Sequence, residues 1–206
     1  MKGAALRLHS YVVARDYGFA PNPFYGFCTL ATCKPKIRKK AETGDWVIGT
    51  GSKSRGREGR LVYAMLVTET LTFDEYWDDV RFAHKRPYMH GSKKQSFGDN
   101  IYHHVGNRWR QEDSHHSLES GAQNPRNVKN DTQTNRVLVS NDFVYYGGAG
   151  PLLPKRFRNF NGVDICGRRG HKNHFPEKMV TQFVAWVRSL EETGYRSAPL
   201  DWSKSR

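Results

Sequence analysis

Histidines and carboxylates gather in the middle of the sequence. His103 and His104 form one pair, and Asp113 shortly precedes a second pair, His115 and His116. Imidazole and carboxylate groups transfer protons near neutral pH and bind transition metals. The spacing matches no established metal motif, so we assign no metal ligand. If the chain catalyses a reaction, His115 or His116 is the candidate general base. Metal binding, contacts to a base or phosphate, and a structural role are the alternatives.

The cysteines suggest two further kinds of chemistry. Cys33 precedes Lys34, whose ammonium group favours a nucleophilic thiolate. Alternatively, Cys28 and Cys33 could join Cys166 and His171 in a zinc site, although structural zinc sites usually contain closer cysteine pairs. Buried packing is the ordinary role of such cysteines.

A glycine-rich stretch over residues 44–53 follows a dense basic run. Its apolar residues 46–48 predict a buried strand, after which come two glycines, two hydroxyl groups and a lysine. Glycines let a ligand approach the backbone, and N–H groups beside a lysine suit a phosphate or a polar base edge. We therefore expect nucleotide contacts from Thr50, Ser52 and Lys53, with Lys34 and Asp45 as a further candidate catalytic set. An ordinary turn is the alternative.

Positive charge dominates the composition. The chain has 33 Lys and Arg against 20 Asp and Glu, which gives a formal net charge of +13. Such an excess favours polyanions, of which nucleic acid is the commonest. A solvated cationic surface is the alternative. The residues expected to steer phosphates are Lys36, Arg38, Arg55 and Arg57, and further cations cluster at Lys155, Arg156 and Arg158 and at Arg168, Arg169 and Lys172.

The sequence lacks the features of a secreted or membrane protein. Residues 1–10 contain no long apolar segment of the kind found in signal peptides. No run approaches the roughly 18 apolar residues of a membrane span. Three cysteines, an odd number, argue against a disulfide framework. We therefore expect a cytoplasmic protein that forms one domain over residues 1–206.

Strands and short helices must position the candidate residues. Apolar and β-branched residues predict strands over 6–15, 46–48 and 60–72, and Pro35 predicts the start of a helix over 35–41. Residues 16–26 carry four aromatic rings in an irregular segment, where they either stack on a base or cap the core. A further helix is expected over 73–82, with a capping box of Thr72 and Glu75.

The second half of the chain is less regular. Residues 84–135 show no periodicity and form a long polar insertion, rich in His and Asn, which is either functional or disordered. Residues 136–140 and 142–146 predict two strands or one bent strand, and apolar residues at helical spacing predict a C-terminal helix over 176–192. This order indicates an α+β fold: a small mixed β-sheet or β-barrel with helices at its rim.

Several motifs resemble a bacterial and phage family, the nucleotide modification associated domain of the second type. The likeness covers most of the chain and implies an association with the modification or handling of DNA bases. It implies no defined reaction and no catalytic residue. The motifs that carry it are residues 10–24, 29–35, 44–52, 97–102, 113–117, 142–148 and 164–166.

The order of the elements is also similar to that of PUA-like folds, which include the EVE, YTH, ASCH and SRA domains. Several of these domains hold one flipped or modified base in an aromatic pocket. The PUA-like core would comprise about residues 6–82 and 136–150. The expected base-binding or nucleotide-binding residues are then Asn22, Phe24, Tyr25, Lys34, Thr50, Ser52, Lys53, Asn100 and Tyr102.

Together these features predict a protein that binds nucleic acid or a nucleotide and recognises a base, in particular a modified base. Such a protein would act in DNA modification or phage defence. Expected partners are nucleic acid, nucleotides and other proteins of such a system, without a membrane. No cofactor can be named. An enzyme acting on a nucleobase or nucleotide through a His, Lys and Asp site is the alternative. An interaction subunit without its own ligand is a third hypothesis.

Overall fold

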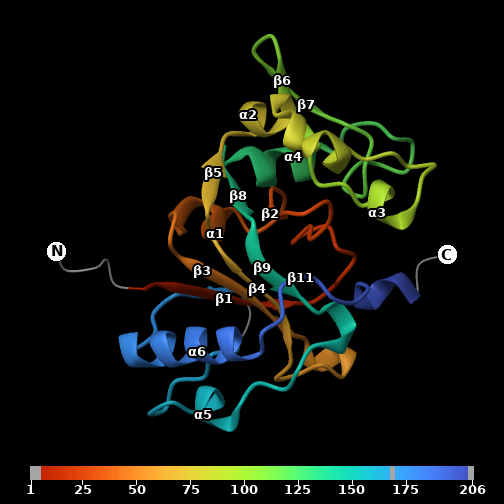
Figure 1. Cartoon of the computed structure of the whole chain (residues 1–206). Coiled ribbons are helices and arrows are strands. Elements are labelled where there is room, and N and C mark those ends of the chain that lie inside the picture. Colours follow the sequence, from red (N-terminus) through yellow and green to blue (C-terminus); the bar gives the residue numbers. More distant parts are fainter. Residues whose placement is uncertain (1–5, 168–169, 204–206) are drawn as a thin grey trace.

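A six-stranded sheet forms the centre of the computed structural model, which describes residues 6–167 and 170–203 (Figure 1). Strand β1 runs parallel to β3, and β9 to β11, whereas the other neighbouring strands are antiparallel. The sheet is therefore mixed, as predicted. Within the described residues it ends at β10 on one side and β11 on the other, so the β-barrel alternative is wrong. In spatial order its strands are β10 (His171–Lys172), β1 (Leu8–Val13), β3 (Trp46–Gly51), β4 (Leu61–Leu66), β9 (Asp142–Tyr145) and β11 (Gly194–Tyr195).

A second sheet contains β2 (Cys28–Leu30), β8 (Val137–Ser140) and β5 (Glu69–Leu71), in that order. The chain passes from β8 to β9 through a turn in which the Ser140 hydroxyl accepts a 3.1 Å hydrogen bond from the Asp142 amide. Residues 136–146 are thus two strands that belong to different sheets. The strand expected over 60–72 divides in the same way, into β4 and β5.

Each face of the six-stranded sheet packs against a different layer, because side chains alternate along a strand. Helices α5 (Lys155–Arg158) and α6 (Glu177–Ser189) cover one face (Figure 1), where Ile48, Phe157 and Phe183 are buried together. Tyr11 and Tyr63 point to the other face, toward β2 and α1 (Pro35–Lys40). The C-terminal helix is confirmed. None of the helices in the described ranges is long and apolar enough to cross a bilayer.

The polar insertion is ordered, although its sequence shows no periodicity. It continues from α2 (Phe73–Asp78), whose capping box of Thr72 and Glu75 is confirmed. Buried polar contacts anchor it: the Lys85 ammonium donates to the side-chain and main-chain oxygens of Asn22, and Asp99 accepts from Tyr76. Residues that are held by buried polar contacts give no apolar periodicity in the sequence. Its elements are the 3₁₀ helix η2 (Val80–Lys85), α3 (Lys93–Ser96), the hairpin of β6 (Tyr102–Val105) and β7 (Arg108–Gln111), and α4 (Pro125–Thr132).

Most of the glycine-rich stretch lies in a strand, because β3 continues to Gly51. A Cβ atom at Gly49 would lie 2.5 Å from the Tyr63 ring, and one at Gly51 would lie 2.0 Å from the Arg57 carbonyl oxygen. The Thr50 hydroxyl is buried and donates to the Tyr11 carbonyl at 3.4 Å. Both glycines therefore permit close packing between neighbouring segments of the protein itself.

Candidate active site

A hollow of about 450 Å³ opens where the end of β1 meets the insertion. Segments far apart in the sequence line it: the end of β1 with the aromatic residues after it, the turn between β2 and α1, and a loop of the insertion. Its aromatic, cationic and nucleophilic lining residues include Tyr17, Phe19, Cys33, Lys34, His115 and His116. This combination makes the hollow the candidate active site.

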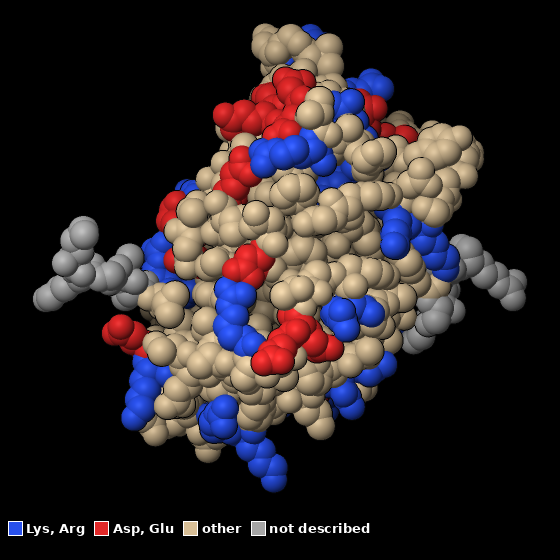
Figure 2. Space-filling view, in the orientation of Figure 1, with Lys and Arg blue, Asp and Glu red and all other residues tan. Residues whose placement is uncertain are grey.

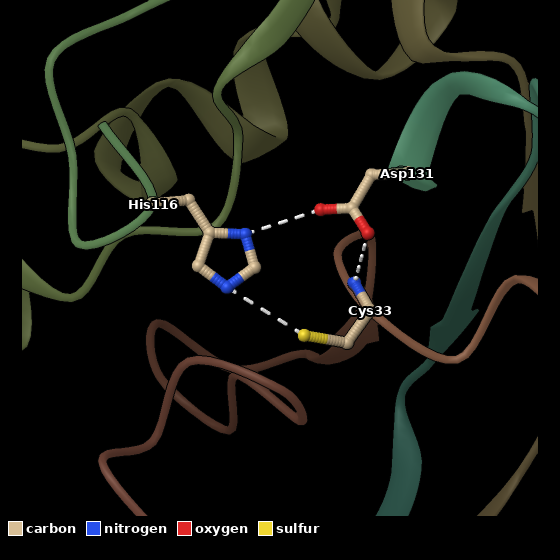
Figure 3. Close-up of side chains that lie close together, drawn as sticks. All are labelled: Cys33, His116 and Asp131. Atoms are coloured by element: carbon tan, nitrogen blue, oxygen red, sulfur yellow. Dashed lines mark hydrogen bonds and ion pairs between the residues drawn. The ribbon is translucent and has the colours of Figure 1, made fainter. Parts of the chain in front are cut away.

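Cys33 and His116 line this hollow and form a connected series with Asp131, which lies behind His116 (Figure 3). The His116 Nε2 atom lies 3.6 Å from the Cys33 Sγ atom, and its Nδ1 atom lies 3.1 Å from an Asp131 carboxylate oxygen. Asp131 is fully buried, whereas Cys33 and His116 are partly exposed. A thiol, an imidazole and a carboxylate in this order match a nucleophile, a proton-transfer group and the residue that orients it.

The Asp131 carboxylate is held in place on both oxygens. One oxygen accepts two hydrogen bonds, from the Asn130 side chain at 3.0 Å and from the Cys33 amide at 2.9 Å. The other accepts from the Tyr102 hydroxyl at 3.0 Å and faces His116. Helix α4 positions this residue, since Pro125 lies at its start and the Asn124 side chain caps it. The carboxylate therefore sets the orientation of the imidazole ring.

The backbone at Cys33 and Lys34 adopts an uncommon conformation. Their φ angles are 55° and 43°, in the left-handed region that non-glycine residues rarely occupy, which costs about 1–3 kcal/mol at each residue. Asp131 accepts from the Cys33 amide, and the Arg38 guanidinium donates to the Cys33 carbonyl at 2.9 Å. These bonds hold the backbone in this conformation, which directs the thiol into the hollow.

Neighbouring groups shift the pKa values of the two histidines in opposite directions. Burial alone disfavours the charged His116 ring, but the hydrogen bonds and charges of Asp131 and Cys33 outweigh it and raise the pKa of His116 to about 9. Desolvation, together with the charges of His116 and Arg15, lowers the pKa of His115 to about 4. At neutral pH, His116 is thus a proton donor and His115 a neutral acceptor, and a general base at either position stays a prediction.

The raised pKa of His116 predicts a pH-dependent stability. A folded-state pKa of about 9, above the ordinary 6.5, stabilises the fold fully below about pH 6.5, and this stabilisation is lost as the pH rises through 9. The shift corresponds to at most about 3 kcal/mol. NMR titration should give a His116 pKa near 9 in the wild type and a value below 7 in Asp131→Asn. A wild-type pKa near 6.5 would contradict the arrangement.

Aromatic rings form one wall of the hollow. The His115 ring centre lies 4.7 Å from that of Tyr17 and 5.0 Å from that of Phe97, and the Phe19 ring centre lies 4.6 Å from that of His116. Tyr17 and Phe97 are stacked at 5.2 Å. Rings arranged in this way offer a surface on which a base can stack.

The C-terminal segment secures this wall. The Trp202 indole N–H donates to the Tyr17 carbonyl at 2.7 Å, and its ring stacks on Phe24. Asp16 accepts from the Leu200 amide, and its own amide donates to the Asp201 carboxylate at 2.7 Å. Residues almost 190 positions away along the chain therefore set the position of the aromatic segment.

Cys33, His116 and Asp131 also have ligand atoms within 4.8 Å of one another, which raises the question of a metal. Asp131 lies on the Nδ1 side of the ring and Cys33 on the Nε2 side. A metal at Nε2 would thus have two protein ligands, with Asp131 as a hydrogen-bonding partner of the histidine. Zinc sites normally provide three or four protein ligands. The donor set suits proton transfer better than metal binding.

The structure brings together His115, His116 and Lys34 of the predicted catalytic residues. Asp45 is instead engaged by Arg7 and His9, outside the hollow. Tyr102 contacts the site only through its hydrogen bond to Asp131. Tyr25 instead faces His84, and the two ring centres are 5.6 Å apart. Lys53 is exposed. The other predicted base-binding residues are buried, and their side chains contact other parts of the protein; these residues are Asn22, Phe24, Thr50, Ser52 and Asn100.

The predicted phosphate-steering residues do not form one surface. Arg38 is fully buried and donates to four main-chain carbonyls, so the expectation that it meets phosphates is wrong. Arg55 forms a 3.3 Å ion pair with Asp201, and Arg57 packs against Gly51. Lys36 is exposed. Figure 2 shows Lys and Arg dispersed over one face among Asp and Glu. Arg168 and Arg169 lie outside the described residues.

A second hollow, of about 660 Å³, lies on the other side of β1. It contains Lys53, Cys166 and His171, whereas Cys33 lines the first hollow and Cys28 is buried in β2. The zinc site considered from the sequence is therefore not assembled. Burial raises the pKa of Cys166 to about 11, which leaves little of this thiol as thiolate at neutral pH.

Sequence reasoning missed Asp131, Arg15, Tyr17 and Phe19 as individual site residues. Asp131 lies in a run of polar residues and would be expected at the surface, but it is fully buried. The aromatic segment 16–26 did carry a signal, because four rings in an irregular connection are unusual. Which of those rings face the hollow depends on the insertion that packs against them.

Comparison with known proteins gives one match. The model of the family described as nucleotide modification associated domain 2 matches residues 5–206. No curated protein and no solved structure matches the chain, so the likeness to PUA-like folds stays a prediction. Because the family match covers nearly the whole sequence, this protein belongs to the nucleotide modification associated domain 2 family, whose description connects it with the modification of nucleotides.

Proposed function

We propose that this protein is an enzyme that acts on a nucleotide through covalent catalysis by Cys33. The observation that carries the proposal is the contact of the Cys33 thiol with His116, whose far side is fixed by a buried carboxylate. A binding pocket for a base needs aromatic rings and polar edges, but it does not need this arrangement. The family match supports nucleotides as the substrates.

The geometry supports a nucleophilic mechanism. The charged His116 ring stabilises a thiolate at Cys33, which attacks an electrophilic carbon of the base or of its substituent. As the carbon–sulfur bond forms, a π bond at that carbon opens, and the released electron pair takes a proton from His116. The substituent that this carbon carries then leaves with that proton as the π bond forms again, and water replaces the sulfur, which returns a thiolate to Cys33 and a proton to His116. Asp131 keeps the ring in the orientation that both steps need.

The aromatic wall would hold the reacting base. Tyr17 and His115 present their rings beside the thiol, and the neutral His115 ring also offers a hydrogen-bond acceptor. Stacking on an aromatic side chain contributes about 1–3 kcal/mol per base and tolerates different bases. The identity of the base would then be set by polar contacts, for which His115 is the nearest candidate.

Turnover measurements test this proposal. The full chain would be incubated with deoxynucleotides carrying ordinary and modified bases, and products would be detected by mass spectrometry. Replacing the nucleophile in Cys33→Ala should reduce turnover by at least about 100-fold. The matched control Cys166→Ala changes a thiol outside the hollow and should retain activity.

Two outcomes would contradict the proposal. Turnover that survives Cys33→Ala would exclude covalent catalysis. Saturable nucleotide binding without turnover, unchanged in Cys33→Ala, would instead identify a module that recognises a base, the function favoured by the sequence alone. Purification without a His tag followed by metal analysis provides a check, because a stoichiometric metal lost in His116→Gln would indicate a metal centre at this position.

A further inference from the structure

The candidate active site contains positive charge without a neutralising carboxylate. Arg15 and Lys34 line the hollow together with the His116 ring, and no Asp or Glu occurs among the described residues that line it. Asp131 lies behind His116, and Asp16 is turned toward Leu200 and Asp201. The lining thus carries the two unpaired positive charges of Arg15 and Lys34 beside the thiol, in addition to the His116 ring, which is paired with Asp131.

The two cations of the lining lack an acidic partner. Over residues 6–167 and 170–203, no ion pair joins Arg15 or Lys34 to a carboxylate, whereas several other arginines have one, as Arg7 has Asp45 and Arg188 has Asp142. Arg15 and Lys34 differ from the other unpaired cations in their position, because both line the hollow that contains the Cys33 thiol.

Both cations are placed at the hollow by distinct structural features. The Lys34 ammonium lies 4.7 Å from the centre of the Tyr11 ring, and the left-handed backbone turns this residue toward the hollow. Arg15 follows β1 and lies close enough to His115 for its charge to act on that ring. Two cations from separate segments therefore converge beside Cys33.

We propose that Arg15 and Lys34 bind a phosphate group of the substrate, so that the enzyme acts on nucleotides and not on nucleosides or free bases. This inference rests on the proposed function, because it assigns the substrate class of the same site. A phosphate supplies the negative charge that the lining lacks, and guanidinium and ammonium groups are its usual partners. The phosphate could belong to a mononucleotide or to a phosphodiester in a strand, and both share this chemistry.

The charge preference of Cys33 alkylation tests the anion site without a known substrate. Iodoacetate carries a carboxylate, whereas iodoacetamide is neutral and of similar size. In the wild type, the ratio of the iodoacetate rate to the iodoacetamide rate should be about tenfold higher at Cys33 than for a small uncharged thiol such as 2-mercaptoethanol. The ratio should fall at least about fivefold in the double variant Arg15→Gln and Lys34→Gln, because the attracting charges are removed. Lys39→Gln, an exposed cation on α1, is the control and should keep the ratio.

Protection of Cys33 from iodoacetamide then identifies the source of the phosphate. The four deoxynucleoside 5′-monophosphates should protect at concentrations at least about tenfold lower than the matching deoxynucleosides. Stronger protection by a single-stranded oligonucleotide than by the monophosphates would assign the phosphate to a strand. Equal protection by nucleosides and nucleotides, or an alkylation ratio unchanged in the double variant, would overturn the inference. The proposed function has a separate test: it fails if iodoacetamide alkylates Cys33 no faster than Cys166.

Discussion

Iodoacetamide is expected to alkylate Cys33 at least about 100-fold faster than Cys166 at pH 7.5. Alkylation requires a thiolate, and burial raises the pKa of Cys166 to about 11, so little of that thiolate exists at this pH. Cys33 instead contacts a His116 ring that is charged at neutral pH. Peptide mapping by mass spectrometry at successive times gives the two rates in one sample of folded protein. Cys28 is fully buried in β2 and should react only on unfolding.

Variants separate the effect of His116 from that of exposure. His116→Gln removes the positive charge beside the thiol and should slow alkylation of Cys33 about tenfold or more, with the rate at Cys166 unchanged. Asp131→Asn should slow it less, because the ring remains but the carboxylate that favours its charged form is lost. A rate at Cys33 that is insensitive to His116→Gln would show that the thiol is merely accessible, and would remove the basis for covalent catalysis.

Arg38→Met is expected to destabilise the protein by about 3–5 kcal/mol. The buried guanidinium donates to the carbonyl oxygens of Cys33, Asp131, Thr134 and Arg136, at 2.6–2.9 Å. Methionine fills much of the same space but leaves these buried acceptors without a donor. Burial lowers the pKa of Arg38 only to about 10, so the guanidinium is charged at neutral pH. The substitution therefore removes a charged hydrogen-bond donor.

Urea unfolding of the two proteins gives this difference in free energy. Lys39→Met, at the exposed neighbouring position on α1, is the matched control and should change stability by less than about 0.5 kcal/mol. Because Arg38 holds the carbonyls of Cys33 and Asp131, folded Arg38→Met should also lose the fast alkylation of Cys33. A loss of less than about 1 kcal/mol would mean that water or a rearranged side chain replaces the guanidinium.

Local pattern predicted the elements that carry a strong apolar period. The C-terminal helix and the two strands that follow the insertion were found because their apolar side chains repeat at the spacing of a helix or a strand. The insertion was not readable in this way. Its order depends on buried polar contacts, such as those of Lys85 with Asn22 and of Asp99 with Tyr76, which join residues far apart in the chain.

The glycine-rich stretch shows how a local pattern can support two interpretations. A strand followed by glycines and a lysine is typical of a phosphate-binding loop. The same residues also allow β3 to pass close to Tyr63 and to the Arg57 backbone. Only the neighbouring strand decides between them, because the space beside a glycine is filled either by a ligand or by the protein.

The sequence by itself determined the family and the mixed α+β character, and it indicated His115, His116, Cys33 and Lys34 as candidate site residues. These properties depend on residue types and on short-range spacing, which a sequence contains directly. Tertiary structure alone decided that Cys33, His116 and Asp131 meet, and that Arg15 and Lys34 line the same hollow with no Asp or Glu among its described lining residues. The three residues of this series are separated by up to 98 positions, and only the packing of the insertion against β1, β2 and α1 brings them within hydrogen-bonding distance.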